Sequence, residues 1–312
     1  MNEQSLPPDL EVGPSIATAD GELPSMWHIS LKLKAAHEAG IDGSGITFSI
    51  NDTGVFEEHG YFGNQEFDFE HFNSTSSNGM DDKNGHGTHC YGITTSVAPG
   101  AVGIWTKVLS DRGSGSTTGI DKGRIHAAKQ GADVISESLG DGGGPVIRDS
   151  YEAIETAYNE GTSICVAAAG NSGFNGRNST VGRHASYDNA WCQGATKRDG
   201  SIAGFSSGGK TLDAATPGQS IVSCGLKSSW HWVSMSGTSM ATPFMAGIFC
   251  LVIQKRRMIG KPDLIGRNAW LDFMLQEGFM EDRGDDGHDP RFGHGVPSID
   301  KILDALIDPE WV

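Results

Sequence analysis

The sequence predicts an α/β fold, doubly wound, with a mostly parallel central sheet and helices on both faces. Short apolar runs typical of buried strands alternate along the chain with amphipathic helical patterns, and this alternation favours βαβ units. The 37% hydrophobic content is enough for a sizeable core, and the 20% charged content is too moderate for a disordered chain. Glycine accounts for 44 of the 312 residues, about double the usual share of roughly 7%.

The elements follow one another in the order that such a fold requires. A helix is expected over 27–37, ending near Gly40, and the first strand over 45–50 closes on the turn Asp52-Thr53-Gly54. Further strands are expected over 102–109, 133–138, 163–168 and 191–195, and further helices over 118–130, 146–159 and 239–254. Residues 1–20 are polar and lack periodicity, so we expect an N-terminal extension at 1–20 and a single large domain at 21–312.

Charge and hydropathy exclude several classes of partner. The formal net charge is −16, which argues against nucleic acid or an anionic membrane as the main partner. The longest apolar stretch, 244–253, is far short of the roughly 20 residues that a spanning helix needs. Five cysteines without a CxxC pair favour free thiols in a reducing compartment. Because the segment after Met1 also lacks the pattern of a secretory signal, we expect a cytoplasmic protein.

Three short segments carry the chemistry. Asp52 lies in the turn after the first strand, His86 stands between two glycines at the apparent start of a helix, and Ser239 begins an apolar helix. A serine hydroxyl needs a base to accept its proton, an imidazole suits that task, and a carboxylate fixes the tautomer of the imidazole. Asn171, just past the strand over 163–168, is a candidate oxyanion donor. Pro243 is expected in the first turn of its helix.

Together these motifs resemble those of the subtilisin-family serine proteases. The resemblance rests on Asp52-Thr53-Gly54, His86-Gly87-Thr88-His89, Ser138-Leu139-Gly140, Ala168-Ala169-Gly170-Asn171 and Gly237-Thr238-Ser239-Met240-Ala241-Thr242-Pro243, and it runs from about residue 24 to 295. It implies a serine endopeptidase that hydrolyses peptide bonds through an acyl-enzyme. Asp52 would be the orienting acid, His86 the general base, Ser239 the nucleophile and Asn171 the side-chain oxyanion donor. His89 would pack nearby as a helix residue.

The resemblance also implies how peptide or protein substrates bind. The substrate-binding residues would be Gly113, Ser114, Gly115, Ser138, Leu139, Gly140, Ala168, Ala169, Gly170 and Gly182. Two edges of this set would hold the peptide extended through main-chain hydrogen bonds, and Gly182 would leave room for a large apolar side chain. Cys90 matches a free cysteine found beside the histidine in the proteinase K branch, so thiol reagents are expected to inhibit.

Calcium is where the chain departs from the family. The strong calcium site of the family uses an aspartate where this chain has Tyr61. The loop that interrupts the helix after the catalytic histidine is absent, since Thr94-Thr95-Ser96 runs directly into Val97-Ala98-Pro99. Since calcium takes six to eight oxygens, we expect that this site is lost. Asp213 is a candidate for a weaker cation site, and no other metal is predicted.

The short extension is typical of the intracellular subtilisin branch, in which it blocks the cleft until it is removed. Leu6-Pro7-Pro8 would serve that purpose because a proline resists cleavage at its bond; a disordered tail is the alternative. The oligomeric state and the physiological substrate stay open.

Four other functions compete with a protease of this kind. A subtilase fold without activity, used for peptide binding, would need a hidden defect, since every motif residue is present. A lipase-type enzyme would need Gly-x-Ser-x-Gly, which 237–241 lacks, and an aspartic protease would need a second Asp-Thr-Gly. A metal hydrolase would use His71, His86 and His89, but no third close-spaced ligand supports it.

Overall fold

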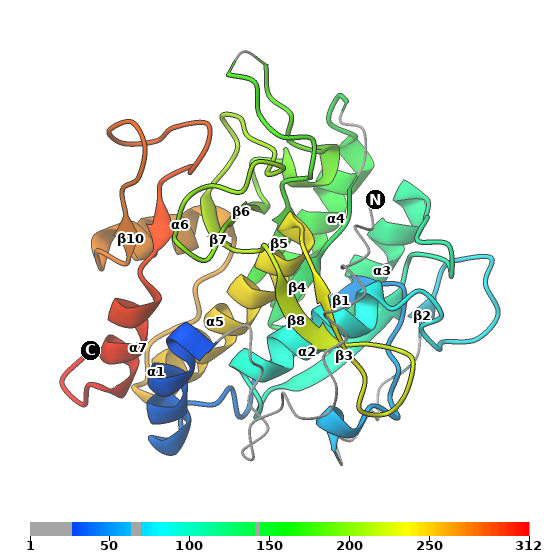
Figure 1. Ribbon diagram of the computed structural model, residues 1–312, viewed down its shortest axis with the longest axis horizontal. Helices are drawn as coiled ribbons and strands as arrows, with labels where there is room; N and C mark the ends of the chain where they lie inside the picture. The colour runs from blue at the N-terminus through cyan, green and yellow to red at the C-terminus, as the bar shows by residue number, and fades with distance from the viewer. Residues whose placement is uncertain (1–26, 64–69, 71, 141–143, 177, 312) are drawn as a thin grey trace.

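A seven-stranded parallel sheet forms the centre of the computed structural model, which describes residues 27–63, 70, 72–140, 144–176 and 178–311 (Figure 1). The strands follow the order β2-β3-β1-β4-β5-β6-β7, and every pairing between neighbours is parallel. The strands are β1 Thr47–Asp52, β2 Phe72–Asn73, β3 Val102–Lys107, β4 Val134–Glu137, β5 Ile164–Ala168, β6 Trp191–Thr196 and β7 Ala214–Pro217. The predicted fold class is confirmed.

Helices cover both faces of this sheet. They are α1 Trp27–Glu38, α2 His86–Val97, α3 Thr117–Lys129, α4 Arg148–Asn159, α5 Thr238–Met258, α6 Arg267–Gln276 and α7 Ile299–Ile307. Two small antiparallel pairs complete the described fold, β8 Ile221–Cys224 with β9 Trp232–Met235, and β10 Met280–Glu281 with β11 Val296–Pro297. Residues 1–20, with Leu6-Pro7-Pro8, and His71 lie outside the described residues.

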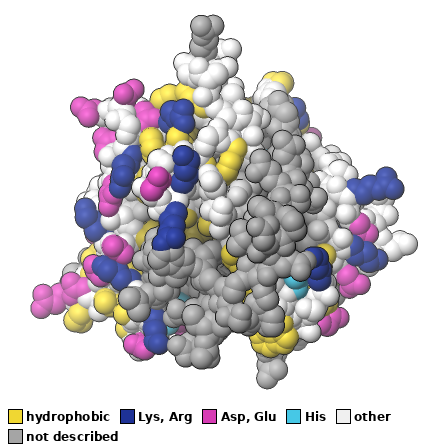
Figure 2. Space-filling model, in the orientation of Figure 1, with side chains coloured by type: hydrophobic (Ala, Val, Ile, Leu, Met, Phe, Trp, Pro, Cys, Tyr) yellow, Lys and Arg dark blue, Asp and Glu magenta, His cyan; other side chains and the backbone are white. Residues whose placement is uncertain are grey.

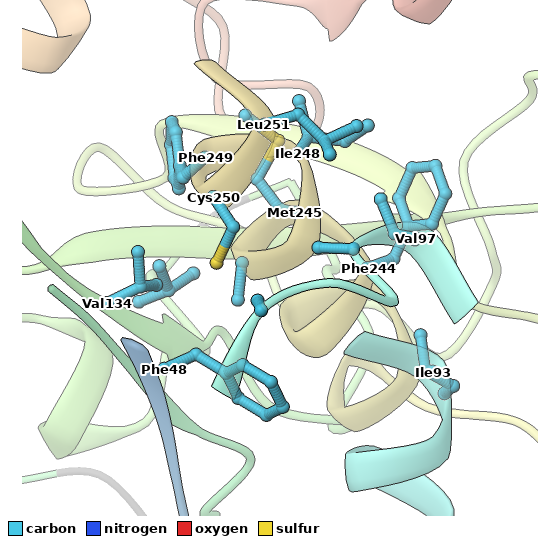
Figure 3. Close-up of a cluster of buried hydrophobic side chains, with 14 of the residues drawn as sticks. Phe48, Ile93, Val97, Val134, Phe244, Met245, Ile248, Phe249, Cys250 and Leu251 are labelled. Carbon is cyan, nitrogen blue, oxygen red and sulfur yellow. The ribbon is translucent and has the colours of Figure 1, made fainter. Parts of the chain in front are cut away.

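Side-chain alternation along the strands separates two cores. Phe48 and Val134 face α2 and α5, where Ile93, Val97, Phe244 and Ile248 pack with them in the largest cluster (Figure 3). Residues at the intervening strand positions, such as Ile135, point to the other face and pack against α3 and α4, because successive side chains of a strand alternate between faces. The carboxyl ends of the strands therefore open between two packed helical layers, which is where open α/β sheets bind ligands.

Pro243 was predicted to lie in the first turn of its helix, but the helix α5 begins too early for that. It starts at Thr238, so Pro243 is its sixth residue and not part of the first turn. A proline inside a helix has no N–H for the carbonyl four residues before it, which here is the carbonyl of Ser239. The oxygen of that carbonyl accepts hydrogen bonds from Ser138 Oγ at 2.8 Å and Cys90 Sγ at 3.4 Å instead. The proline thus frees a backbone acceptor at the residue on which the chemistry depends.

Candidate active site

Three neighbouring strands deliver the candidate residues to one edge of the sheet. Asp52 is the last residue of β1, Ser138 follows β4 directly, and Asn171 lies three residues after β5. Because β1, β4 and β5 are adjacent and parallel, their carboxyl ends lie side by side. Residues that are far apart in the sequence are therefore brought together by the strand order alone.

Asp52 and His86 are in direct contact. The Nδ1 atom of His86 lies 2.8 Å and 2.9 Å from the two carboxylate oxygens of Asp52, which is fully buried. An ionised carboxylate only accepts hydrogen bonds, so Nδ1 holds the proton and Nε2 of the neutral ring is left as an acceptor. Thr53 N also donates to Asp52 at 2.8 Å. The arrangement fixes both the tautomer and the orientation of an imidazole whose side chain is 12% exposed.

The pKa of His86 reflects two opposing influences. Burial disfavours the charged ring and lowers the pKa, but the negative charge of Asp52 and its hydrogen bond outweigh burial and hold the pKa well above its usual value. Burial raises the pKa of the neighbouring Cys90 thiol, so Cys90 is neutral at pH 7. His86 therefore gains its proton affinity chiefly from Asp52, and it accepts a proton readily when the ring is neutral.

Asp82 holds the first turn of α2 and is a supporting residue that was not among the predicted site residues. Its buried carboxylate accepts five hydrogen bonds of 2.7–2.9 Å, from Thr53 Oγ1, from the N–H groups of Asn84, Gly85 and Thr88, and from Thr88 Oγ1. A carboxylate there satisfies N–H groups that a helix start leaves unpaired and complements the helix dipole. An aspartate four residues before a glycine-flanked histidine was the available signal in the sequence.

Close backbone approach explains the glycine after His86. A Cβ atom on Gly87 would lie 2.2 Å from the carbonyl oxygen of Gly54, so no other residue fits without moving the chain. Gly87 N donates to Thr53 Oγ1 at 2.9 Å, and Thr53 in turn donates to Asp82. This chain of contacts joins the turn after Asp52 to the helix that carries His86.

Ser239 is the second residue of α5 and is half-buried. Its Oγ lies 3.4 Å from the carbonyl oxygen of Ser138, while Ser138 Oγ donates to the carbonyl of Ser239 at 2.8 Å. Cys90 Sγ lies 4.0 Å from His86 Nδ1 and 3.4 Å from the carbonyl oxygen of Ser239. One buried thiol therefore contacts both His86 and Ser239, which brings the imidazole and the hydroxyl-bearing residue to the same place.

Two N–H donors converge beside Gly237. Asn171 Oδ1 accepts from Thr238 N at 2.8 Å, and this bond turns the amide nitrogen of Asn171 the other way. A Cβ on Gly237 would lie 3.2 Å from that Nδ2 atom and 3.5 Å from the main-chain nitrogen of Ser239. Because glycine has no Cβ, this space is open next to two amide nitrogens and the positive end of the α5 dipole, an arrangement that suits an oxyanion.

The other predicted residues divide into two groups. Ser138, which Leu139 and Gly140 follow in the chain, bonds to the carbonyl of Ser239. The segment 168–170 leads directly to Asn171, and Gly182 joins that segment by donating to the carbonyl of Ala169 at 2.9 Å. Residues 113–115 follow β3. Directly after this strand, the N–H groups of Val108 and Leu109 both donate to the carbonyl of Asp52 at 2.9 Å. The loop that leads to Gly113, Ser114 and Gly115 therefore begins beside Asp52, at the carboxyl edge of the sheet.

His89 is built into the structure as a neutral residue. It is fully buried, and Nε2 donates toward the carbonyls of Ile221 and Val233 at 3.1 Å and 3.0 Å. Burial is the main cause that lowers its pKa to about 3. Within the described part of the chain, the one cluster of three potential metal ligands is Asp52, His86 and Cys90, whose ligand atoms lie within 4.8 Å. A metal centre that pairs His86 with His89 therefore has no support.

Aromatic packing surrounds Tyr61, the residue at which the resemblance places a calcium ligand of the family. Tyr61 packs edge-on against Trp232, with ring centroids 5.2 Å apart, and His59 is bonded to the carbonyl of His231 at 2.9 Å. The helix α2 runs without interruption from His86 to Val97. Aromatic rings do not supply the six to eight oxygens that calcium takes.

Asp213 is a poor cation ligand for another reason. It is fully buried, Oδ1 accepts from the Arg267 guanidinium, with 2.9 Å to Nε, and Oδ2 accepts from Cys192 N at 2.8 Å. Both carboxylate oxygens are thus engaged, and the positive partner is an arginine. The expectation of a weak cation site at Asp213 is not supported by this geometry.

Comparison with known proteins identifies the family. The parallel sheet, with Asp52, His86 and Ser239 at its carboxyl edge, defines the class of serine hydrolases with a subtilisin-like fold. The pattern of the subtilase family matches residues 43–295. Thermitase of Thermoactinomyces vulgaris is 38% identical over 230 residues, which cover 69% of this chain and 77% of thermitase. Subtilisin DY of Bacillus licheniformis is 34% identical over 267 residues, 81% of this chain and 93% of that protein. Subtilisin Savinase of Lederbergia lenta is 35% identical over 244 residues, 73% and 84% of the two chains.

The chain belongs to the subtilase family and is a serine endopeptidase, which acts on peptide or protein substrates. Subtilases commonly bind calcium. In the described residues, no helix is both long and apolar enough to cross a membrane.

Proposed function

We propose that the enzyme hydrolyses peptide bonds through an acyl-enzyme on Ser239. The observation that carries the proposal is the contact of His86 Nδ1 with both oxygens of Asp52, next to a serine at a helix start. Ser239 Oγ attacks the carbonyl carbon while its proton passes to His86 Nε2. The imidazolium then gives this proton to the leaving amine, and Asp52 stabilises the charged ring throughout. A water molecule then attacks the acyl-enzyme through the same steps, which releases the carboxylic acid product and frees Ser239.

The oxyanion of each tetrahedral intermediate would lie beside Gly237. Asn171 Nδ2 and the N–H of Ser239 are the donors that this position offers. Both are fixed before the substrate arrives, the first because Asn171 Oδ1 is bonded to Thr238 N and the second because it belongs to a helix. Donors that need no reorganisation stabilise developing charge most effectively.

The substrate would bind as an extended strand between two main-chain edges. Residues 113–115 would form one edge and residues 138–140 the other, with Ala168, Ala169, Gly170 and Gly182 around the side chain next to the scissile bond. Gly182 adds no side chain to that space, which favours a large apolar residue of the substrate. Cleavage-site profiling on a digested proteome tests this preference.

A catalytically silent subtilase is the competing function, and the site argues against it. No substitution among Asp52, His86, Ser239 and Asn171 breaks the pattern, and each is held by the hydrogen bonds described above. Hydrolysis of a chromogenic peptide by the full chain, lost in both Ser239→Ala and His86→Ala, is the expected result. Equal hydrolysis by the wild type and by Ser239→Ala would contradict the mechanism.

We also propose that the strong calcium site of the family is lost in this chain. The aromatic packing of Tyr61 and the uninterrupted helix α2 support the proposal. A chelator in excess is then expected to leave the melting temperature of the Ser239→Ala protein almost unchanged. A large decrease that added calcium reverses would contradict it.

We propose further that the enzyme works in the reducing environment of the cytoplasm. All five cysteines are free and buried, as is usual where disulfides do not form. On the face drawn in Figure 2, acidic and basic side chains are interspersed over the described part of the surface, which offers nucleic acid no continuous basic patch. Fractionation of the cells that produce the protein tests the proposal, and the protein is expected in the cytoplasmic fraction.

Self-inhibition by residues 1–20 is a further part of this proposal. It rests on Leu6-Pro7-Pro8, because a proline at the scissile bond resists cleavage. A protein that begins near Gly21 is then expected to hydrolyse peptides faster than the full chain. Equal rates per titrated active site would contradict it.

A further inference from the structure

A buried ion pair lies on the face of the sheet opposite the active-site serine. Arg124 of α3 is fully buried and donates to both carboxylate oxygens of Glu137, from Nε to Oε1 at 3.1 Å and from Nη2 to Oε2 at 2.5 Å. Asn51 Nδ2 donates to the same Oε1 at 3.0 Å. A bidentate guanidinium–carboxylate pair is both strong and specific in direction, so Glu137 is held from two sides.

The surroundings satisfy every group of this pair. Arg124 Nη1 donates to Asp121 Oδ1 at 3.1 Å and to the carbonyl of Ser150 at 3.3 Å. Asn51 Oδ1 accepts from Thr106 Oγ1 at 2.6 Å. Burial raises the pKa of Asp121, opposed by the charge of Arg124. The cluster is therefore a closed polar network inside an apolar layer that also contains Ile104, Ile135 and Cys165.

The position of the network in the sequence relates it to the chemistry. Asn51 directly precedes Asp52 at the end of β1, and Glu137 directly precedes Ser138 at the end of β4. The register pairs Ile50 with Ser136, so the two polar side chains are the next neighbours along adjacent strands. On the other face, Asp52 holds His86, and Ser138 exchanges two hydrogen bonds with Ser239. The hydrogen bond from Asn51 to Glu137 thus joins the two strand ends that carry the two halves of the site, and the ion pair with Arg124 fixes Glu137.

Stability alone gives little reason for this network. A buried ion pair loses the hydration of both charges, and apolar side chains of similar volume often stabilise a protein equally well or better. What apolar side chains do not supply is direction, because dispersion contacts tolerate small shifts whereas a bidentate pair does not.

We propose that Arg124 and Glu137 are positioning residues that hold the ends of β1 and β4 at the separation which Asp52, His86 and Ser239 need. The inference rests on the roles proposed above for those three residues. Shifts near an active site are costly, since a displacement of about 1 Å can lower the rate by about 10²-fold. The guanidinium of Arg124 fixes Glu137, and Asn51 ties Glu137 to β1. The positions of the strand ends then set the positions of the catalytic residues on the opposite face.

The test replaces the charges together, so that none is left buried alone. In the full chain, Asp121→Asn, Arg124→Met and Glu137→Met are combined, and activity is expressed per active site titrated with a fluorophosphonate. We expect kcat to fall at least about tenfold with KM little changed, while the unfolding midpoint, measured with Ser239→Ala added, stays level or rises. A second variant, Glu137→Gln, keeps the shape of the side chain and is expected to lower kcat by a smaller factor.

The matched control is the ion pair of the buried Asp213 with the partly buried Arg267. It lies just before β7, three strands beyond β4 in the order of the sheet, and Asp213→Asn with Arg267→Met should leave kcat unchanged. A triple variant with wild-type kcat would overturn the inference, and so would a lower midpoint without loss of kcat. If the triple variant does not fold, wild-type kcat in Glu137→Gln overturns it. An inactive wild-type chain would instead refute the proposed function.

Discussion

Asp82 offers a prediction whose size follows from the structure. Its carboxylate divides five hydrogen bonds between two oxygens: Oδ1 accepts three, and Oδ2 accepts from Thr88 N and Thr88 Oγ1. In Asp82→Asn, the NH2 group of the asparagine disrupts the fewest hydrogen bonds when it takes the position of Oδ2. At that position the new NH2 group faces the N–H of Thr88, so the charge-assisted hydrogen bond from Thr88 N is lost. The Thr88 hydroxyl, which donates to Asp82, must instead accept a hydrogen bond from the amide.

The magnitude can be summed from these losses. A hydrogen bond to a charged group contributes about 1.5–3 kcal/mol, and a negative charge at a helix start adds about 0.3–1 kcal/mol. Asp82→Asn should therefore lower the free energy of unfolding by about 2–4 kcal/mol. For a chain of this size the melting temperature should fall by roughly 3–6 °C. Because Asp82 also fixes Thr53 and the turn that carries His86, kcat should fall by about tenfold.

Stability is best measured by urea unfolding with Ser239→Ala present in every protein, which prevents self-digestion. The kinetic part uses the active enzyme and a chromogenic peptide. Asp199→Asn is the control, because Asp199 is an exposed aspartate that also accepts two bonds from a nearby serine, Ser201 N and Oγ. If Asp82→Asn shifted the urea midpoint no more than Asp199→Asn and kept the wild-type kcat, the account of α2 would be refuted.

Three further predictions concern the site itself. Asn171→Ala should lower kcat by about 10²- to 10³-fold with little change in KM, as is usual when one oxyanion donor is removed. The rate constant kcat/KM should rise with pH as His86 loses its proton, with a midpoint above 6.5 because the pKa of His86 is raised; in the weakly active Asp52→Asn the midpoint should fall, since burial, which lowers the pKa, is then less opposed. Pro243→Ala supplies the missing helix N–H to the carbonyl of Ser239, competes with Ser138 and Cys90, and should lower kcat severalfold. Steady-state kinetics against a peptide checks all three, and unchanged values would contradict each in turn.

Local patterns in the sequence were enough to predict most of the central fold. The runs expected at 102–109 and 163–168 correspond to β3 and β5 within a few residues, because strands buried on both faces are nearly continuous in apolar residues. The strand β7 escaped notice, since Ala214–Pro217 is short and contains small residues and a proline. The hairpin of β8 and β9 was missed as well, because its turn residues give no two-residue hairpin signal.

The candidate site could be predicted where a motif exposes a side chain, but not where a buried side chain supports it. Asp52, His86 and Ser239 stand in glycine-rich or small-residue turns, which single them out. Arg124 and Glu137 are charged residues in an ordinary helix and strand, and only the tertiary structure reveals that both are buried and face each other. Pairing across the sheet depends on strand order, which a single sequence does not contain.

The most direct test of the account is the site of covalent labelling. The full chain is treated with a fluorophosphonate, digested, and the modified peptide is located by mass spectrometry. We predict one equivalent of label on Ser239, with loss of peptidase activity in proportion, much slower labelling in His86→Ala and none in Ser239→Ala. Label on another residue, or peptide hydrolysis that survives complete labelling of Ser239, would contradict it.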